Sequence, residues 1–258
     1  MGDIKGVILA GGTGSRLHPL TRITNKHLLP IYDRPMVTYA VEAMVGAGVE
    51  EMMIVTGGTH AGEFFRLLGN GHDYGVDRLL YAYQERPGGI AEALGLTERF
   101  AGDAKILVML ADNIVERSIR PAVEAFLAQA GGARIVLSPI DDPAHLRNLG
   151  VPELDGEGRV VRILEKPDDP PSHFAVTGFY LYDAGVFEVI PQLEPSGRGE
   201  LEITDVNNFY VDAGTMEYDV LEGFWGDAGE SIDAYYQVND FVRAHGANHQ
   251  DRTGPAPG

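Results

Sequence analysis

A glycine-rich turn stands immediately behind the first apolar run of the chain. The run Gly6–Ala10 reads GVILA, and it is followed by Gly11, Gly12, Gly14 and Arg16. Glycines without a Cβ let backbone N–H groups turn toward an anion, and arginine adds a permanently charged, planar fork. A loop behind the first strand lies at the carboxyl edge of a parallel sheet, where open α/β folds bind ligands. These residues predict a phosphate-binding loop, although a plain tight turn has the same composition.

Residue spacing excludes the two best-known glycine loops. A P-loop requires a lysine directly after its last glycine, but the first lysine behind this turn is Lys26. A dinucleotide-binding loop requires a third glycine and an acidic residue at the end of the second strand. Leu17 stands near the place of that glycine, and the second apolar run, Glu51–Thr56, ends in threonine.

Polar side chains end two further apolar runs. Gln84 closes the run Leu79–Gln84, and Asp112 follows the run Lys105–Leu110. An amide carries a donor and an acceptor side by side, which suits the imide edge of thymine or uracil, although Gln84 taken alone is more typical of a polar strand end. Asp112 could reach a phosphate through Mg²⁺, which prefers oxygen ligands, and Asp227 offers a second carboxylate. Either aspartate alone is also typical of a loop cap.

Composition narrows the class of ligand and the compartment. The 258 residues carry 20 Lys+Arg against 38 Asp+Glu, a net charge of −18, which excludes a broad positive field for a nucleic-acid polymer or an anionic membrane. We therefore expect a small ligand. Zero cysteines exclude disulfides, thiolate zinc sites and cysteine nucleophiles. Together with the lack of a signal-like or membrane-spanning apolar stretch, this predicts a cytoplasmic protein.

Apolar runs alternate with amphipathic stretches, which predicts an α/β fold: a mostly parallel central sheet with helices on both faces. The expected strands are Gly6–Ala10, Glu51–Thr56, Leu79–Gln84, Lys105–Leu110, Arg134–Pro139, Val160–Leu164, Phe174–Tyr182 and Thr215–Leu221. The expected helices are Met36–Ala47, Ile90–Phe100, Ala122–Ala130, Ala184–Ile190, Ile203–Ala213 and Ser231–Ala244. No linker divides the chain, so we expect one catalytic domain, residues 1–245, and a loosely held polar tail, residues 246–258.

The string from Leu9 to Met36, LAGGTGSRLHPLTRITNKHLLPIYDRPM, closely resembles the opening of the sugar-1-phosphate nucleotidyltransferases, most of all the glucose-1-phosphate thymidylyltransferases. The resemblance implies a Rossmann-like nucleotidyltransferase fold with a small sugar-binding β/α addition. Its nucleotide-binding residues would be Leu9, Gly11, Gly12 and Gly14. Arg16 would meet the β- and γ-phosphates, and Lys26 would steady charge on the reacting phosphate chain.

Two later segments are similar to the base and metal segments of that family. The segment Tyr83–Ala93 implies that Gln84 reads the base, while Gly89 lets the base lie against the main chain. The motif around Asp112 and the string WGDAG around Asp227 imply that these aspartates flank one or two Mg²⁺ ions, with Asp112 also contacting the nucleotide.

Further strings resemble the family's sugar-phosphate site. In LEKP, Glu165 would take sugar hydroxyls and Lys166 the phosphate of the sugar. In AVTG, Val176 and Thr177 would line the hexose, and Gly150 matches a sugar-side glycine.

The string RGELEITDVN makes Arg198 another phosphate contact, whereas we expect Thr204 and Asp205 to be structural. The chain departs from the family pattern at Ala111, where the family has glycine, and at Leu149, where it has a tyrosine near the sugar.

The resemblance implies transfer of a nucleotidyl group from dTTP to glucose-1-phosphate, giving dTDP-glucose and pyrophosphate with Mg²⁺. The amide of Gln84 cannot see the methyl group of thymine, so dTTP over UTP depends on the resemblance alone. Alternatives are a sister enzyme that uses UTP or another hexose- or deoxyhexose-1-phosphate, and a non-catalytic sugar-nucleotide sensor. A metal-dependent glycosyltransferase is disfavoured by the Arg16 loop.

The family also implies a homo-oligomer. Longer members add C-terminal regulatory helices, and we expect this chain to be a short form without them, so no regulatory residue is assigned. His18, His27 and His60 lack metal-ligand spacing, and we expect them to be ordinary polar residues. All of these assignments require the glycine turn, both aspartates and Arg198 to converge on one cleft.

Overall fold

The computed structural model describes residues 4–250. The strands are β1 (Ile4–Ala10), β2 (Pro30–Ile31), β3 (Arg34–Pro35), β4 (Glu51–Gly57), β5 (Arg78–Gln84), β6 (Lys105–Leu110), β7 (Asn113–Val115), β8 (Ala133–Pro139), β9 (Gly150–Leu154), β10 (Val160–Glu165), β11 (Phe174–Tyr182), β12 (Met216–Val220) and β13 (Trp225–Asp227). The α-helices are α1 (Met36–Gly46), α2 (Ala61–Leu68), α3 (Ile90–Gly95), α4 (Glu98–Ala101), α5 (Arg120–Ala128), α6 (Pro143–Leu146), α7 (Val186–Val189), α8 (Ile203–Asp212) and α9 (Ile232–His245).

The predicted α/β sheet is confirmed, with antiparallel additions from the second half of the chain. Strands β6, β1, β4 and β5 lie side by side and run parallel, so their carboxyl ends share one edge. Strand β11 joins this sheet antiparallel to β6, and it also pairs with β8 and β9. Its register shifts between Val176 and Tyr180, which lets the strand change partners along its length.

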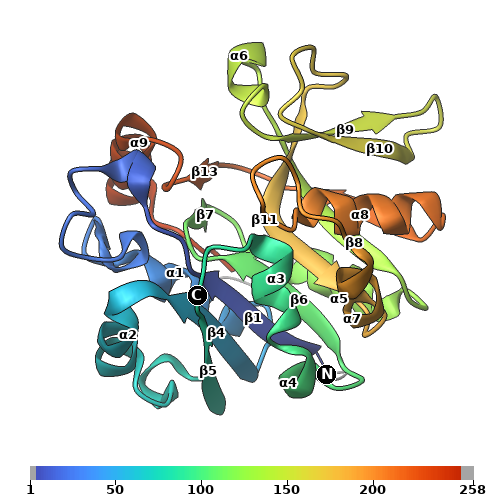
Figure 1. Cartoon of the computed structure of the whole chain (residues 1–258). Coiled ribbons are helices and arrows are strands. Elements are labelled where there is room, and N and C mark those ends of the chain that lie inside the picture. The colour runs from blue at the N-terminus through green and yellow to red at the C-terminus, as the bar shows by residue number, and fades with distance from the viewer. Residues whose placement is uncertain (1–3, 251–258) are drawn as a thin grey trace, which may run out of the picture.

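Helices cover both faces of the sheet, because alternate residues of each buried strand point to opposite sides. From β1, Ile8 packs in one core cluster with residues of α1, α2 and α5. Its neighbour Val7 packs in a second cluster with residues of α3, α4, α7 and α8. A third cluster holds α9 against the segment that follows β1. Figure 1 shows α9 beside β13, at a distance from the strands of the main sheet.

One predicted helix is broken into two, and another is present but shorter than predicted. The helix predicted over Ile90–Phe100 is two short helices, α3 and α4, and between them the Thr97 hydroxyl donates a 2.7 Å hydrogen bond to the Leu94 carbonyl. Such local bonding competes with helix continuation. The helix predicted over Ala184–Ile190 ends as α7, and a 3-10 turn that contains Pro191 follows it, because proline lacks the N–H that an α-helix needs.

Strands β9 and β10 form an antiparallel pair at the edge of the same sheet and, with α6, stand above the parallel strands in Figure 1. This pair meets the main sheet through Val176 of β11, which is opposite Gly150 of β9. The arrangement leaves a hollow between the pair and the carboxyl edge of the parallel strands. Within residues 4–250, no helix is long and apolar enough to cross a membrane.

The first residues of the predicted loose tail are held in place. The N–H of Asn248 donates to the Val115 carbonyl at 2.9 Å, and the N–H of Ser118 donates to the His249 carbonyl at 2.9 Å. The expectation of a loose tail is therefore wrong for residues 246–250, because backbone pairing holds them. The rest of the predicted tail, residues 251–258, lies outside the described residues.

Candidate active site

A cavity of about 390 Å³ opens at the carboxyl edge of the parallel strands. Its size is that of a small-molecule site. Every residue to which the sequence assigned a role lines it: Leu9, Gly11, Gly12, Gly14, Arg16, Lys26, Gln84, Gly89, Asp112, Gly150, Glu165, Lys166, Val176, Thr177, Arg198 and Asp227. The structure thus brings the glycine turn, both aspartates and the late arginine together, as the assignments require.

The glycine turn has the backbone that its composition favours. Gly12 has φ +93° and Gly14 has φ +63°, values that side chains with a Cβ rarely adopt. The Thr21 hydroxyl donates a 2.8 Å hydrogen bond to the Gly14 carbonyl, which holds the turn. Arg16 follows in a 3-10 turn, Ser15–Leu17, and makes no ion pair with any described residue. Its guanidinium is therefore available to an anion that enters the cavity.

Lys26, which is partly buried, forms an ion pair with buried Asp112 on the floor of the cavity. Burial alone lowers the pKa of Lys26, but the charges of Asp112 and Asp227 outweigh it, so this pKa lies above its ordinary value. Burial would raise the pKa of Asp112, but Lys26 holds it well below its usual range. Lys26 is thus protonated and Asp112 is ionised at neutral pH.

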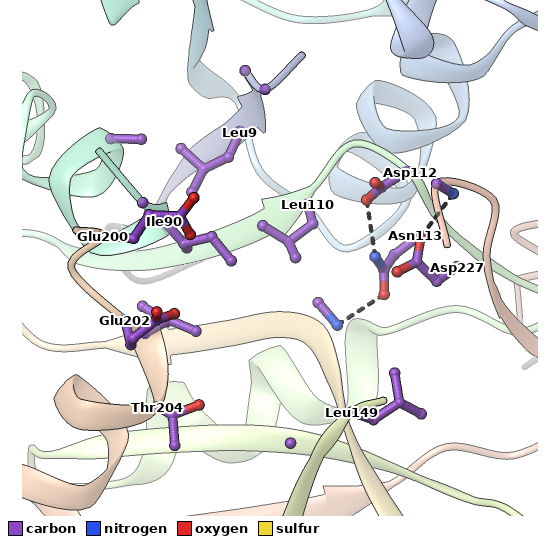
Figure 2. A pocket seen from close by; sticks show the side chains of 18 of the residues that line it. Leu9, Ile90, Leu110, Asp112, Asn113, Leu149, Glu200, Glu202, Thr204 and Asp227 are labelled. Carbon is purple, nitrogen blue, oxygen red and sulfur yellow. Dashed lines mark hydrogen bonds between the residues drawn. The ribbon is translucent and has the colours of Figure 1, made fainter. Parts of the chain in front are cut away.

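Asp227 reaches the same point from a distant part of the chain. Its strand β13 pairs antiparallel with β7, and Asp227 lies opposite Asn113, the neighbour of Asp112 (Figure 2). Burial and the charge of Asp112 raise the pKa of Asp227 to about 7. The single cation of Lys26 does not neutralise both carboxylates.

The donor set fits a divalent cation. Asp112 is buried and Asp227 is partly buried, and the two carboxylates share one lysine. A Cβ at Gly229 would overlap the Asp112 carboxylate, so only a glycine lets the backbone pass this close to it. Within residues 4–250, no group of three or more acidic or histidine side chains could hold a metal by itself. Mg²⁺ is commonly held by one or two carboxylates, with substrate phosphates and waters completing its shell. Asp112 and Asp227 would be the ligands that the protein supplies.

Asn113 is a residue of the site whose contacts the sequence analysis did not foresee. Its Oδ1 accepts from the N–H of Gly178 at 2.8 Å and from Trp225 Nε1 at 2.7 Å. Its Nδ2 donates to Asp112 at 3.2 Å, as Figure 2 shows. The side chain therefore ties β7, β11 and β13 together behind Asp112. Its place directly after Asp112 was the only available signal.

We expected His27 to be an ordinary polar residue, but it is buried. Its ring is buried, lines the cavity and bonds to Asn25 Oδ1 at 2.9 Å. Burial and the neighbouring charge of Lys26 lower the pKa of His27 to about 3. The imidazole is therefore neutral, and it adds no charge beside Asp112.

Carboxylates and cations also pair on the opposite wall, below the β9–β10 pair. Lys166 Nζ lies 3.5 Å from Glu165 Oε1, and Arg198 holds Glu202 through two contacts of 2.9 and 3.0 Å. The Thr204 hydroxyl donates to Glu165 at 2.8 Å. Thr204 is structural as predicted, but it acts by fixing the carboxylate that was assigned to the sugar. Figure 2 shows Glu202, Thr204 and Leu149 facing Asp112 and Asp227 across the cavity.

Lys166 carries backbone strain at this wall. It has φ +48°, in the left-handed region that a residue with a side chain rarely adopts, and it precedes Pro167. Its N–H donates to the Leu149 carbonyl at 3.0 Å, which ties the turn to the loop before β9. Strain of this kind is concentrated at functional sites.

Gln84 closes the cavity on the side of α3. The side chain is buried, and its Nε2 donates at 3.2 Å both to the Gly89 carbonyl and to Glu92 Oε1. The sequence suggested that this amide offers a donor and an acceptor to a base. In the folded chain, the donor is already used within the protein.

Comparisons with known proteins agree with this geometry. The family described as Nucleotidyl transferase matches residues 5–245. The chain belongs to this family. A glucose-1-phosphate thymidylyltransferase of an Actinoplanes species is 44% identical over 244 residues, which cover 93% of this chain and 78% of that protein. The glucose-1-phosphate thymidylyltransferase of Neisseria meningitidis is 39% identical over 243 residues, which cover 93% of this chain and 83% of that protein.

Solved structures of nucleotidyl transferases share the fold. A crystal structure from Bacillus anthracis, of a candidate glucose-1-phosphate thymidylyltransferase in complex with sucrose, is 45% identical and has a TM-score of 0.87, covering 93% of this chain and 96% of that one. A UDP-glucose pyrophosphorylase complexed with UDP-glucose has a TM-score of 0.80 at 24% identity, covering 93% of this chain and 98% of that one. At that identity, the second structure shows a common fold alone.

Proposed function

We propose that this nucleotidyl transferase makes dTDP-glucose and pyrophosphate from dTTP and glucose-1-phosphate. The observation that carries the proposal is the meeting, in one cavity, of a glycine turn with a free arginine, two carboxylates and a second pair of cations. Two relatives at 39–44% identity bear the name of this activity, which supports the choice of substrates. Residues 1–245 would act as one catalytic domain.

The reaction is an in-line displacement in which an oxygen of the sugar phosphate attacks the α-phosphorus and pyrophosphate departs. A phosphate monoester is already ionised near neutral pH, so no general base is required, and catalysis consists of positioning and charge neutralisation. Gly11, Gly12 and Gly14 would wrap the nucleotide, together with Leu9, while Arg16 would hold the leaving pyrophosphate.

The opposite wall would hold the sugar phosphate. Lys166 and Arg198 would bind its phosphate once it displaces their present carboxylate partners, Glu165 and Glu202. The freed carboxylates would then accept from sugar hydroxyls, while Gly150, Val176 and Thr177 line the hexose. This exchange of partners lets a chain of net charge −18 bind two anions, since salt screens distant charges within about 8–10 Å.

Mg²⁺ is the proposed cofactor, and when bound it would neutralise charge on the α-phosphate. Asp112 and Asp227 would hold it, and Lys26 would keep Asp112 ionised and add positive charge at the reacting phosphates. The cytoplasmic location and the homo-oligomeric state stay predictions.

A nucleotide panel tests the proposed substrates. Purified protein is mixed with glucose-1-phosphate, Mg²⁺ and each of dTTP, UTP, dCTP, dATP and dGTP, and pyrophosphate release is measured. We expect the highest kcat/KM with dTTP. Equal or faster turnover with UTP would favour the sister enzyme, because Gln84 reads neither the methyl group nor its absence. Selective nucleotide binding without turnover on any sugar phosphate would favour the sensor.

The substitution Asp112→Asn tests the metal assignment. It should lower kcat by at least about 100-fold at saturating substrates, because the change removes a charged ligand but keeps its shape. Asp103→Asn, at an exposed aspartate outside the cavity, is the matched control and should keep full activity. Circular dichroism should show both variants folded. Full activity of Asp112→Asn would contradict the assignment.

A further inference from the structure

The amide of Gln84 is held in one orientation by its neighbours. Its nitrogen Nε2 lies 3.2 Å from the Gly89 carbonyl oxygen and 3.2 Å from Glu92 Oε1. A backbone carbonyl and a carboxylate can only accept hydrogen bonds. The nitrogen of the amide, with its two N–H groups, must therefore face both of them. A turned amide would set its oxygen against two acceptors.

Glu92 is well placed to fix this orientation. It stands in the first turn of α3, where the amino end of a helix favours negative charge. Its second oxygen, Oε2, lies 3.4 Å from Arg86 Nη2, so the carboxylate is held between a cation and the amide. A Cβ at Gly88 would overlap the Glu92 carboxylate, which shows how closely the loop before α3 packs on it.

What Gln84 presents to the cavity is then its carbonyl oxygen alone. Both N–H groups are occupied, and Oε1 points toward the glycine turn, where a Cβ built on Gly11 would lie 3.1 Å from it. Gln84, Gly89 and Gly11 all line the cavity. A ligand that meets Gln84 there encounters an acceptor with no adjacent donor.

We propose that Glu92 is a positioning residue that locks the Gln84 amide, so that its oxygen selects nucleobases with a ring N–H and rejects cytosine. This inference rests on the proposed function, in which Gln84 reads the base. Thymine and uracil carry a hydrogen on N3, which Oε1 can accept. Cytosine presents an acceptor at N3, and two acceptors would face one another. A site that leaves a buried polar group unpaired discriminates strongly against such a ligand.

The experiment measures nucleotide binding without a sugar phosphate, by titration calorimetry of the full chain with Mg²⁺. The ligands are dTTP, dCTP and N3-methyl-dTTP, which keeps the thymine ring but lacks the N3 hydrogen. The unsubstituted protein should bind dTTP at least about tenfold more tightly than either analogue. Glu92→Leu frees the amide to turn and should bring the dTTP-to-dCTP ratio close to one. Glu92→Gln keeps an oxygen acceptor and should retain the selectivity.

Glu98→Leu, the same change at an exposed position of α4, is the matched control and should leave the ratio unchanged. Circular dichroism checks the fold, and Glu92→Ala is a second variant that lacks the acceptor. Equal binding of dTTP and N3-methyl-dTTP by the unsubstituted protein would contradict the inference that the Gln84 oxygen accepts from the base. Full selectivity in folded Glu92→Leu and Glu92→Ala would overturn the role of Glu92. Selective binding without synthesis of dTDP-glucose would contradict the proposed function and leave this inference standing.

Discussion

The role of a side chain in the cavity depends more on the groups it contacts than on its residue type. Lys26 reads as a surface cation in isolation, but its burial beside Asp112 makes it part of the cavity floor. The same holds for Asn113, whose oxygen accepts from two different strands. A buried polar group that loses such partners costs about 1–3 kcal/mol, so these contacts rigidify the site.

Gly89 must be a glycine for two reasons, its backbone conformation and the close approach of a neighbouring segment. It has φ +98°, and a Cβ there would overlap the backbone of Leu201, whose carbonyl accepts from the N–H of Ala91. We expect Gly89→Ala to lower the free energy of unfolding by about 2 kcal/mol or more and to weaken nucleotide binding. Denaturant unfolding and nucleotide titration measure the two effects.

Gly62→Ala is the matched control for this prediction. Gly62 lies in α2 with ordinary φ, and no other group lies within 4 Å of the point that an alanine methyl would occupy, so alanine should stabilise the helix slightly, by up to about 1 kcal/mol. Equal changes in the free energy of unfolding for Gly89→Ala and Gly62→Ala would show that neither backbone strain nor the contact with Leu201 requires glycine at position 89.

At the scale of elements, a side-chain contact joins α6, which precedes the β9–β10 pair, to the loop before α9. His145 of α6 lies 2.8 Å from Glu230, which stands in that loop. The hydrogen bond to Glu230 raises the pKa of His145 above its ordinary value, despite partial burial, with Asp142 and Asp227 acting in the same direction. The pair thus links α6 to the loop before α9 by a contact that is strengthened by the charge of His145.

We expect this link to weaken as pH rises. The folded state raises the pKa of His145, so its stabilisation is fully present below the ordinary histidine value of about 6.5 and is lost as pH rises through the folded pKa. His145→Gln should therefore lower Tm more at pH 6 than at pH 9. The ring is 35% exposed, so the loss should stay below about 1 kcal/mol.

Thermal unfolding at both pH values measures the difference between each variant and the unsubstituted protein. His60→Gln, whose ring stands 4.0 Å from exposed Glu63, is the control and should change Tm little at either pH. A Tm loss in His145→Gln that is the same at pH 6 and pH 9 would rule out the charged contact.

At the scale of the whole molecule, the last described residues pack against α1 and the segment that follows β7. Asn248 Nδ2 donates to the Tyr39 carbonyl in α1 at 2.9 Å, and the N–H of His249 donates to Glu116 at 2.7 Å, just beyond β7. Since β7 pairs with β13, which carries Asp227, the end of the described chain supports the segment that brings the two aspartates together.

Asn248 has φ +58°, so two substitutions separate its side chain from its backbone. Asn248→Gly removes the bond to Tyr39 without strain and should cost about 1 kcal/mol, or about 2–4 °C in Tm for a chain of this size. Asn248→Ala adds a strained backbone and should cost more. Differential scanning calorimetry measures both, and an alanine variant as stable as the glycine variant would contradict this account.

The sequence by itself determined the strands of the parallel sheet, since runs such as Lys105–Leu110 are apolar after their first residue and match β6 at both ends. It also marked the glycine turn, Gln84 and Asp112 as neighbours, because carboxyl ends of parallel strands share one edge whatever lies between them. The residues of the opposite wall were marked by the family resemblance alone. Short elements escaped it. Strands β7 and β13 have three residues each, too few to show a period, yet their register places Asp227 opposite Asn113.

Only the tertiary structure decided which groups pair within the cavity. Hydrogen bonds and ion pairs form between atoms a few ångströms apart, and sequence patterns carry no information at that distance between residues far apart in the chain. Gln84 shows the consequence: its type allowed a donor and an acceptor, but Gly89 and Glu92 take the donor and leave the oxygen. The fold leaves only the acceptor of this amide available to a ligand, although the free side chain has both a donor and an acceptor.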